Sequence, residues 1–301
     1  MSIEPTNKHL SVEIKTNGRR TQASEDSEQL ETELENGETS SSRAGQQNDR
    51  DGNEFAYQLN GHYDPKRRKI YLFLLSFSIF NALVGLALIL TWMLKYRPVT
   101  GFGISNSGQL SNLHVLFMFS FMVSLNMYAV LIYRTHYSQR KQQLKWAHAT
   151  LTGLTMSMSL LGVAAMYKSH LMANIPNFYS LHSWIGVLTN VIYVSQFSVA
   201  FLTFLKPGLS SVELRAKLLP WHRLIGISLV MMAGLAAITG IAEMVIFQDR
   251  NTQAYSSFSP ITFIANFAGI SVLLVTATTV YMLTDRQYLR PALPEEMAIK
   301  R

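Results

Sequence analysis

Residues 181–205 read LHSWIGVLTNVIYVSQFSVAFLTFL, and this stretch contains no Asp, Glu, Lys or Arg. About 20 apolar residues in a helix cross the hydrocarbon layer of a bilayer, so the stretch predicts a membrane-spanning helix. Its second residue is His182. An ionisable side chain in such a helix is costly and is a candidate functional residue by default. The stretch therefore predicts the fold class and also a position at which chemistry is expected.

Five other segments have the same apolar character, which predicts six membrane-spanning helices. The six expected spans are residues 70–94, 112–133, 146–167, 181–205, 219–247 and 259–283. Residues 1–61 carry twelve acidic and six basic residues and lack hydrophobic periodicity, which is typical of disorder. We therefore expect three parts, namely a disordered acidic cytoplasmic tail (1–61), a six-helix membrane domain (62–285) and a short cytoplasmic C-terminal tail (286–301).

Basic residues are distributed unevenly between the two sides of the expected membrane. The richer side carries Lys66, Arg67, Arg68, Lys69, Arg134, Arg140, Lys141, Lys145, Lys206, Arg215, Lys217 and Arg223. The other side carries Lys95, Arg97, Lys168 and Arg250. The positive-inside rule places the richer side and both termini in the cytoplasm. The net charge of +7 is therefore a topology signal and does not indicate nucleic-acid binding.

Two further features of the composition bear on chemistry and on the membrane boundary. The chain has no cysteine, which excludes disulfides, thiolate catalysis and iron–sulfur clusters. Its four tryptophans all fall near the ends of expected spans, as an interfacial aromatic belt predicts. They are Trp92, Trp146, Trp184 and Trp221.

Four histidines lie near the starts of four successive spans, at positions 114, 148, 182 and 222. Their spacings of 34, 34 and 40 residues each equal about one membrane crossing plus a loop, so successive histidines reach opposite faces. We expect His114 and His182 near the outer face, and His148 and His222 near the inner face. In a four-helix bundle with short connections, parallel helices are diagonal. The two members of each pair should then face each other across the core.

A facing pair of histidines fits a haem better than a zinc ion. Zinc usually takes three or four protein ligands, whereas haem iron takes one or two axial ligands and needs an apolar pocket. Gly186 and Gly226 each follow a histidine by one helical turn, where a missing side chain leaves room for a macrocycle. The residues thus predict an all-α protein of six transmembrane helices, with helices 2–5 forming a four-helix bundle around two haems, which the resemblance described next implies to be b-type haems.

Several motifs within residues 70–285 resemble, in order, those of the cytochrome b561 family. The sequence SLHSW at 180–184 looks like that family's signature at the start of the fourth helix. The sequence NLH at 112–114 resembles the start of the second helix, and AVLIYR at 129–134 resembles its end. In the fifth helix, LRAKLLPWH at 214–222 and GIAE at 240–243 resemble the family's opening and closing segments.

The resemblance implies a transmembrane ascorbate-dependent oxidoreductase with two haems b per chain. In such a protein cytosolic ascorbate gives one electron to the inner haem, and the outer haem reduces monodehydroascorbate or ferric iron. Two axial histidines per iron leave no coordination position for oxygen, which fits electron transfer. The resemblance also implies a homodimer. We expect a multi-pass membrane protein that resides in the plasma membrane or in an endomembrane vesicle or lysosome.

The resemblance assigns four further residues to the inner face. Ascorbate is a small anion, so its site should carry positive charge. The family match selects Lys141, Lys145 and Arg215 for that site. Arg134 is a candidate partner of a haem propionate. Positive-inside topology by itself also explains positive charge at these positions.

Four residues are candidates at the outer face. The resemblance places His170, expected in the loop between the third and fourth spans, close to the outer substrate, together with Asn174 and Tyr179. Glu243 lies near the outer end of the fifth span, and an acidic residue there is a functional candidate by default.

Two alternative functions remain open from the sequence. The first is a dihaem cytochrome that reacts with a quinol as a subunit of a larger complex. The second is a transporter or scaffold without haem, in which the histidines bind protons or a metal ion. Transporters often place polar groups near the bilayer centre, whereas the ionisable residues here cluster near the two faces.

Overall fold

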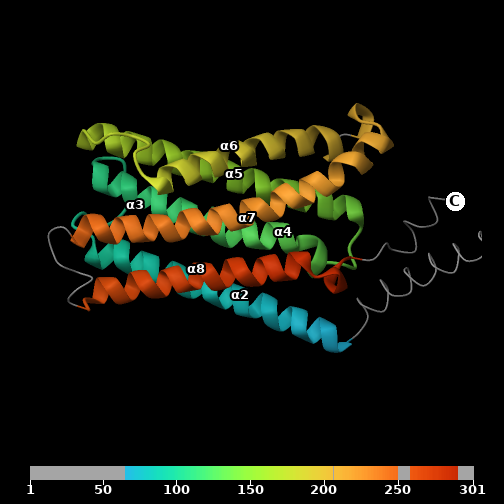
Figure 1. Ribbon diagram of the computed structural model, residues 1–301, viewed down its shortest axis with the longest axis horizontal. Coiled ribbons are helices and arrows are strands. Elements are labelled where there is room, and N and C mark those ends of the chain that lie inside the picture. Colours follow the sequence, from blue (N-terminus) through green and yellow to red (C-terminus); the bar gives the residue numbers. More distant parts are fainter. Residues whose placement is uncertain (1–64, 206, 250–257, 291–301) are drawn as a thin grey trace, which may run out of the picture. The chain divides into compact units, whose positions relative to one another are not determined.

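The structure is a computed structural model that describes residues 65–205, 207–249 and 258–290. The expected acidic tail (1–61) lies outside the described residues, as do residues 291–301 of the expected C-terminal tail. Every regular element in the described ranges is helical (Figure 1). The all-α fold class predicted from the sequence is therefore confirmed.

Six helices of the described chain are long and apolar enough to cross a membrane, and the chain is a multi-pass membrane protein. In chain order they are α2 (Pro65–Thr91) with η1 (Trp92–Tyr96); α3 (Ser107–Phe117) with η2 (Met118–Leu125) and α4 (Asn126–Thr135); α5 (Lys141–Ala173); α6 (Leu181–Ala200) with η3 (Phe201–Leu205); α7 (Val212–Asp249); and α8 (Pro260–Thr284). Two short 3₁₀ turns are η4 (Pro207–Leu209) and η5 (Arg286–Tyr288).

The helices form two groups that meet at α7 and the α3–α4 span. Helix α2 packs against α8, while α5 packs against α3 and α4, and α6 packs against α7. Figure 1 shows α2 and α8 together on one side and α5 and α6 on the other, with α4 and α7 between them. Histidine-bearing helices thus lie next to one another, and α2 and α8 flank them, as predicted.

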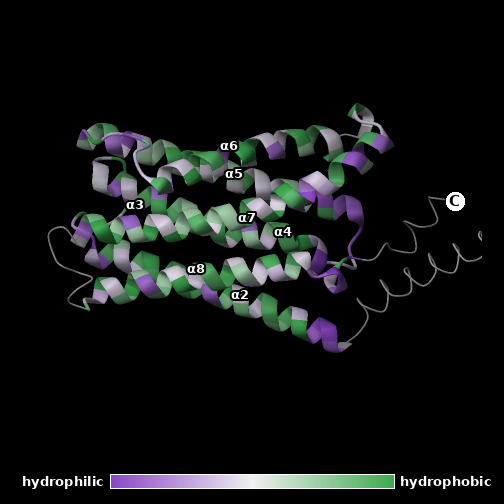
Figure 2. Ribbon diagram, in the orientation of Figure 1, coloured by the Kyte–Doolittle hydropathy of each residue, from purple (hydrophilic) through white to green (hydrophobic). Residues whose placement is uncertain are grey.

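One end of the bundle is strongly basic, and we call it the basic end. It is defined by the start of α2, the α4–α5 connection, and the start of α7, which carry Lys66, Arg67, Arg68, Lys69, Arg140, Lys141, Lys145 and Arg215. Figure 2 shows hydrophilic residues gathered there, while the middle of each helix is largely hydrophobic. We call the other end the opposite end.

Side-chain caps fix where several helices begin. The Asn106 side chain accepts a hydrogen bond of 2.9 Å from the Gln109 amide at the start of α3, and Ser180 accepts one of 3.2 Å from the Ser183 amide at the start of α6. Such caps satisfy amides that have no partner inside the helix. Because His182 lies one residue inside α6, the Ser180 cap also sets its position.

The main apolar core lies between α2, η2, α4, α7 and α8 and includes Trp92. This tryptophan is 0% exposed, and its Nε1 donates a 3.0 Å hydrogen bond to Gln248 Oε1. The other three tryptophans are more than half exposed, as a belt facing lipid requires. The aromatic-belt interpretation is therefore wrong for Trp92, which is a core residue that joins η1 to the end of α7.

The span that carries His114 is interrupted in its middle by a π-helical segment, Met118–Leu125. Such π-helical turns are rare in proteins, and those that do occur are often found at functional sites. The segment leads directly into Asn126, which is 3% exposed and accepts a 3.0 Å hydrogen bond from the Tyr193 hydroxyl of α6. This bond connects two of the histidine-bearing spans deep in the bundle.

Candidate functional site

The four histidines form two pairs, one at each end of the bundle. His114 of α3 faces His182 of α6 at the opposite end, with ring centres 6.1 Å apart and ring planes at 86°. His148 of α5 faces His222 of α7 at the basic end, with ring centres 6.2 Å apart and ring planes at 85°. The structure thus brings together the same pairs that the helix directions indicated.

The separation of the rings fits two imidazoles that share one metal ion. An imidazole–metal bond is about 2 Å long, and the ring centre lies about 1.1 Å beyond the nitrogen, so the two ring centres would lie about 6.3 Å apart. Edge-to-face aromatic contacts cover the same range of distances, so the separation alone does not decide the matter. The hydrogen bonds of the rings provide the second criterion.

Three of the four rings are anchored through Nδ1 to a backbone carbonyl. His114 Nδ1 lies 3.0 Å from Gly162 O, His148 Nδ1 lies 2.8 Å from Ala129 O, and His182 Nδ1 lies 2.9 Å from Ala236 O. A carbonyl can only accept, so Nδ1 carries the proton and Nε2 presents its lone pair. Metal-bound histidines are almost always held in this way. The anchoring therefore favours ligation over simple ring packing.

Glycines leave space beside the rings. A Cβ built on Gly186 would meet nothing within 4 Å, and one built on Gly226 would meet only Gln196 Nε2, at 3.5 Å. The Oε1 atom of Gln196 is buried and has no hydrogen-bond partner. Open space one helical turn from His182 and from His222, together with facing imidazoles whose Nδ1 atoms are mostly anchored, fits a bound macrocycle. The residues present therefore fit a haem.

The close contact between Gly240 and His182 was not predicted from the sequence. A Cβ on Gly240 would lie 2.7 Å from Cε1 of His182, which is too close for any side chain. Gly240 shares a face of α7 with Ala236, whose carbonyl anchors the same ring, and with Glu243, which accepts a 2.9 Å hydrogen bond from the Ser180 hydroxyl. Helix α7 thus holds His182 and its capping residue at three successive turns.

Aromatic side chains and lysine surround the pair at the basic end. The ring of Tyr133 lies 5.9 Å from that of His148, and the ring of Phe204 lies 5.4 Å from that of His222. Lys145 Nζ donates a 3.3 Å hydrogen bond to Phe204 O. Lys145 is therefore close to the pair.

The remaining predicted cations of the ascorbate site gather around Lys145. Lys141 and Arg215 both lie close enough to Lys145 to repel it electrostatically. Three cations from the start of α5 and the start of α7 therefore share one surface at the basic end.

Arg134 has a different set of partners from the one proposed in the sequence analysis. It is only 9% exposed, and its guanidinium donates to the backbone carbonyls of Met282, Leu283 and Asp285. These are carbonyls at the C-terminal end of α8, which lack partners inside the helix. Arg134 therefore caps α8, and its role towards a haem propionate stays a prediction.

At the opposite end His170 is not a loop residue, and the expectation that it lies between two spans is wrong. It lies in the last turn of α5, is 9% exposed, and its Nδ1 is buried without a hydrogen-bond partner. Its ring stacks on Tyr179, with centres 6.2 Å apart and planes at 24°. Asn174 ends α5 in the left-handed conformation, with φ of 52°. Helix α5 runs further than its apolar stretch, which explains the error.

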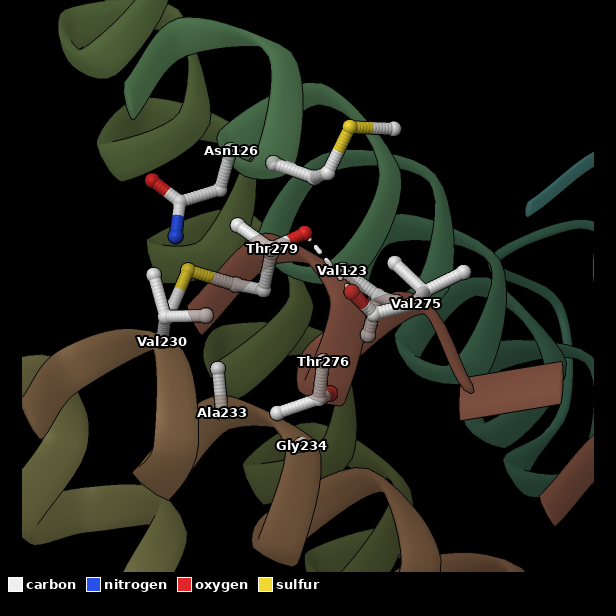
Figure 3. A pocket seen from close by; sticks show the side chains of 10 residues that line it. Val123, Asn126, Val230, Ala233, Gly234, Val275, Thr276 and Thr279 are labelled. Atoms are coloured by element: carbon white, nitrogen blue, oxygen red, sulfur yellow. Dashed lines mark hydrogen bonds between the residues drawn. The ribbon is translucent and has the colours of Figure 1, made fainter. Parts of the chain in front are cut away.

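A separate small pocket lies between η2, α4, α7 and α8 (Figure 3). Its polar residues are Asn126, Thr276 and Thr279, and the described residues that line it include no histidine. In the part of the chain that the structure describes, no group of three or more His, Cys, Asp or Glu could hold a metal ion. The two histidine pairs are therefore the candidate site.

Comparison with known proteins gives consistent similarities. Residues 113–248 match the family model for eukaryotic cytochrome b561, and this range contains all four histidines. The chain is 35% identical over 189 residues to transmembrane ascorbate ferrireductase 2 of Arabidopsis thaliana, across 63% of this chain and 81% of that protein.

Two animal relatives cover more of the chain. Transmembrane ascorbate-dependent reductase CYB561 of Pongo abelii is 32% identical over 224 residues, across 73% of this chain and 86% of that protein. The protein of the same name from Bos taurus is 30% identical over 243 residues, across 80% of this chain and 94% of that protein.

Proposed function

The chain belongs to the cytochrome b561 family and is an oxidoreductase, and we propose that it is a transmembrane ascorbate-dependent reductase. In this proposal electrons pass from ascorbate at the basic end to an acceptor at the opposite end. The observation that carries the proposal is the presence of two histidine pairs, one near each end of a membrane bundle, in each of which the two ring planes are nearly perpendicular.

The family implies haem b, and we propose two haems per chain. His114 and His182 would ligate one, and His148 and His222 the other. When bound, a haem supplies an iron that changes its oxidation state by one electron. Backbone carbonyls hold three of the four imidazoles, those of His114, His148 and His182, so that their Nε2 atoms would be presented to the metal without rearrangement.

We assign the basic end to the cytoplasm. Support comes from the concentration of Lys and Arg at the start of α2, in the α4–α5 connection and at the start of α7. With six spans, both termini then lie in the cytoplasm. The plasma membrane and an endomembrane vesicle or lysosome are both compatible with this orientation.

Ascorbate would bind at the basic end, where Lys141, Lys145 and Arg215 lie close together. Their mutual repulsion favours an anion between them, since an anion relieves the repulsion. Lys145 is linked to the histidine pair through its hydrogen bond to Phe204, whose ring packs against His222. An ascorbate anion there would lie next to the first electron acceptor.

The acceptor would bind at the opposite end, near the stacked rings of His170 and Tyr179 and close to Asn174. We propose monodehydroascorbate or ferric iron as the acceptor. The buried, unpartnered Nδ1 of His170 supports a role in hydrogen bonding or proton supply to that acceptor. A homodimer is proposed on the family relationship alone.

The direct test uses purified protein reconstituted into vesicles with ascorbate trapped inside and a ferric chelate outside. The wild-type protein should reduce external ferric iron only when ascorbate is present within. His148→Ala should abolish this transfer, because the pair at the basic end would lose a ligand. Equal rates with wild-type protein and with protein-free vesicles would refute the proposal. Dependence on added quinol in place of ascorbate would favour the quinol-reactive alternative.

A further inference from the structure

The segment that follows α8 is fixed against the basic end, although the sequence analysis assigned it to a terminal tail. Arg134 donates to the carbonyls of Met282, Leu283 and Asp285. The Asp285 carboxylate then accepts a 2.9 Å hydrogen bond from the Gln287 amide, which starts the turn of η5. The chain therefore leaves α8 in a defined direction.

Tyr288 anchors the end of this turn. It is 7% exposed, and its ring lies 5.3 Å from that of Tyr71 in α2. The Tyr71 hydroxyl is in turn hydrogen-bonded to Thr135 Oγ1 at 2.8 Å. Burial raises the pKa of Tyr288 to about 12, so the phenol stays neutral at physiological pH. Arg290 follows this anchor by only two residues, so the segment restricts its position.

Arg290 reaches from this segment across the α4–α5 connection. Its Nη2 donates a 2.9 Å hydrogen bond to Gln139 O. The guanidinium lies close enough to Tyr133 to interact with its phenol electrostatically. Tyr133 in turn packs against the ring of His148, with ring centres 5.9 Å apart.

Each ring of the basic-end pair packs against an aromatic residue, and each of these aromatic residues interacts with a cation. Phe204 packs against His222 and accepts the hydrogen bond from Lys145. Tyr133 packs against His148 and interacts with Arg290. Lys145 belongs to the predicted ascorbate site, whereas Arg290 belongs to a segment to which no role had been assigned.

We propose that Arg290 is an anion-binding residue of the basic-end site and that it holds a carboxylate or enolate oxygen beside His148. The two sources of such an oxygen are a propionate of the haem bound there and the incoming ascorbate. A guanidinium is suited to this because it presents several donors in one plane and stays charged. The inference rests on the proposed function, since it takes the basic end as the ascorbate and haem site.

The test compares Arg290→Gln with Arg290→Lys in the full-length holoprotein. Arg286→Gln is the matched control, because Arg286 lies four residues earlier in the same segment, is exposed, and its substitution removes the same charge. Two readouts are used, namely an equilibrium redox titration of the haems with chemical mediators and the ascorbate dependence of haem reduction. The titration does not depend on ascorbate, so it tests Arg290 even if ascorbate proves not to be the donor.

If the bound oxygen belongs to a propionate, Arg290→Gln should lower the midpoint potential of one haem, since the positive charge that favours the reduced form is lost. If it belongs to ascorbate, the half-saturating ascorbate concentration should rise about five-fold, with unchanged potentials. In either case Arg290→Lys should stay closer to wild type than Arg290→Gln does.

Arg286→Gln should match the wild-type protein in both readouts. Identical behaviour of Arg290→Gln and Arg286→Gln in both readouts would overturn the proposal. So would an Arg290→Lys protein that is as impaired as Arg290→Gln, because the positive charge would then be irrelevant. If Arg290→Gln loses haem altogether, Arg290→Lys is compared with Arg290→Gln for haem content. Retention of haem by Arg290→Lys would support the proposal, and equal loss of haem would overturn it.

Discussion

The His114–His182 pair and the His148–His222 pair have almost the same ring geometry and very different surroundings. The ring centres are 6.1 and 6.2 Å apart, and both sets of rings are nearly perpendicular. Around the first pair lie a buried histidine stacked on a tyrosine and the carboxylate of Glu243. Around the second lie two aromatic rings and a group of cations.

The comparison separates the features that the two pairs share from those that differ between the two ends of the bundle. The common elements are two facing imidazoles and at least one ring in each pair that a backbone carbonyl orients. In the proposed function, the differing elements decide which molecule can approach each pair. Positive charge at one end favours an anionic donor, whereas the opposite end, with fewer cations, suits release of electrons to a different molecule. The following predictions break or sharpen this difference, from the largest effect to the smallest.

The largest effect is expected from removing one ligand from either pair. His148→Ala should reduce the haem content from two haems to one and abolish reduction by ascorbate. His114→Ala should also leave one haem, but that haem should still be reduced by ascorbate, because the basic-end pair is intact. Haem content and absorption spectra of the two purified variants check this. Ascorbate reduction that survives in the first variant and fails in the second would reverse the assignment of the ends.

The second effect concerns the close approach of α7 to His182. Gly240→Ala would place a methyl group 2.7 Å from the ring. We expect this clash to lower the free energy of unfolding by about 1–3 kcal/mol. We also expect the haem at the opposite end to be displaced or lost. Haem content and the stability of each haem to heating measure the effect.

Gly269→Ala is the control for this change, because a Cβ at Gly269 in α8 would meet nothing within 4 Å. It should leave both haems in place. The account of α7 as the support of His182 fails if the two substitutions have equal effects, or if Gly240→Ala displaces the haem at the basic end.

The third effect concerns the donor site. Lys145→Ala should raise the half-saturating ascorbate concentration roughly five-fold without loss of haem, because one cation near the anion is removed. Lys217→Ala, a change at an exposed residue of the same end, should have little effect. Stopped-flow reduction at a series of ascorbate concentrations distinguishes the two. Equal shifts in both variants would reduce Lys145 to a general contributor to surface charge.

The smallest effect is expected from the cap of α6. Ser180→Ala removes the acceptor for the Ser183 amide and the donor to Glu243, and loss of such a cap costs about 1 kcal/mol. The haem at the opposite end should therefore dissociate at a slightly lower temperature, while the other haem is unaffected. Thermal titration followed at the haem absorption band tests this. No change at either haem would mean that Ser180 does not support His182.

The number of helices could be predicted from the lengths of the apolar runs, and the pairing of the histidines from their spacing along successive spans. For the span 181–205 the predicted and observed limits agree. Other helices are longer than their apolar stretches. Helix α7 begins at Val212, seven residues before the expected span, and continues through Pro220. The hydrocarbon thickness limits apolar length, but it does not limit helix length.

Side-chain partners across helices were less predictable. The role of Arg134 towards a haem propionate stays a prediction, but no local pattern indicated that its guanidinium also caps α8, through carbonyls some 150 positions away in the sequence. Trp92 looked interfacial and is fully buried. The approach of Gly240 to His182 and the position of Arg290 likewise depend on how helices cross, and one sequence does not encode those contacts in any local pattern.

The most direct test of the central claim is a reduced-minus-oxidised absorption spectrum of the purified protein, with ascorbate as the reductant and haem quantified per chain. The account predicts a b-type spectrum, two haems per chain, and reduction by ascorbate without any other donor. A well-folded protein that binds no haem would contradict it and would turn the four histidines into proton or metal ligands of a different kind of membrane protein.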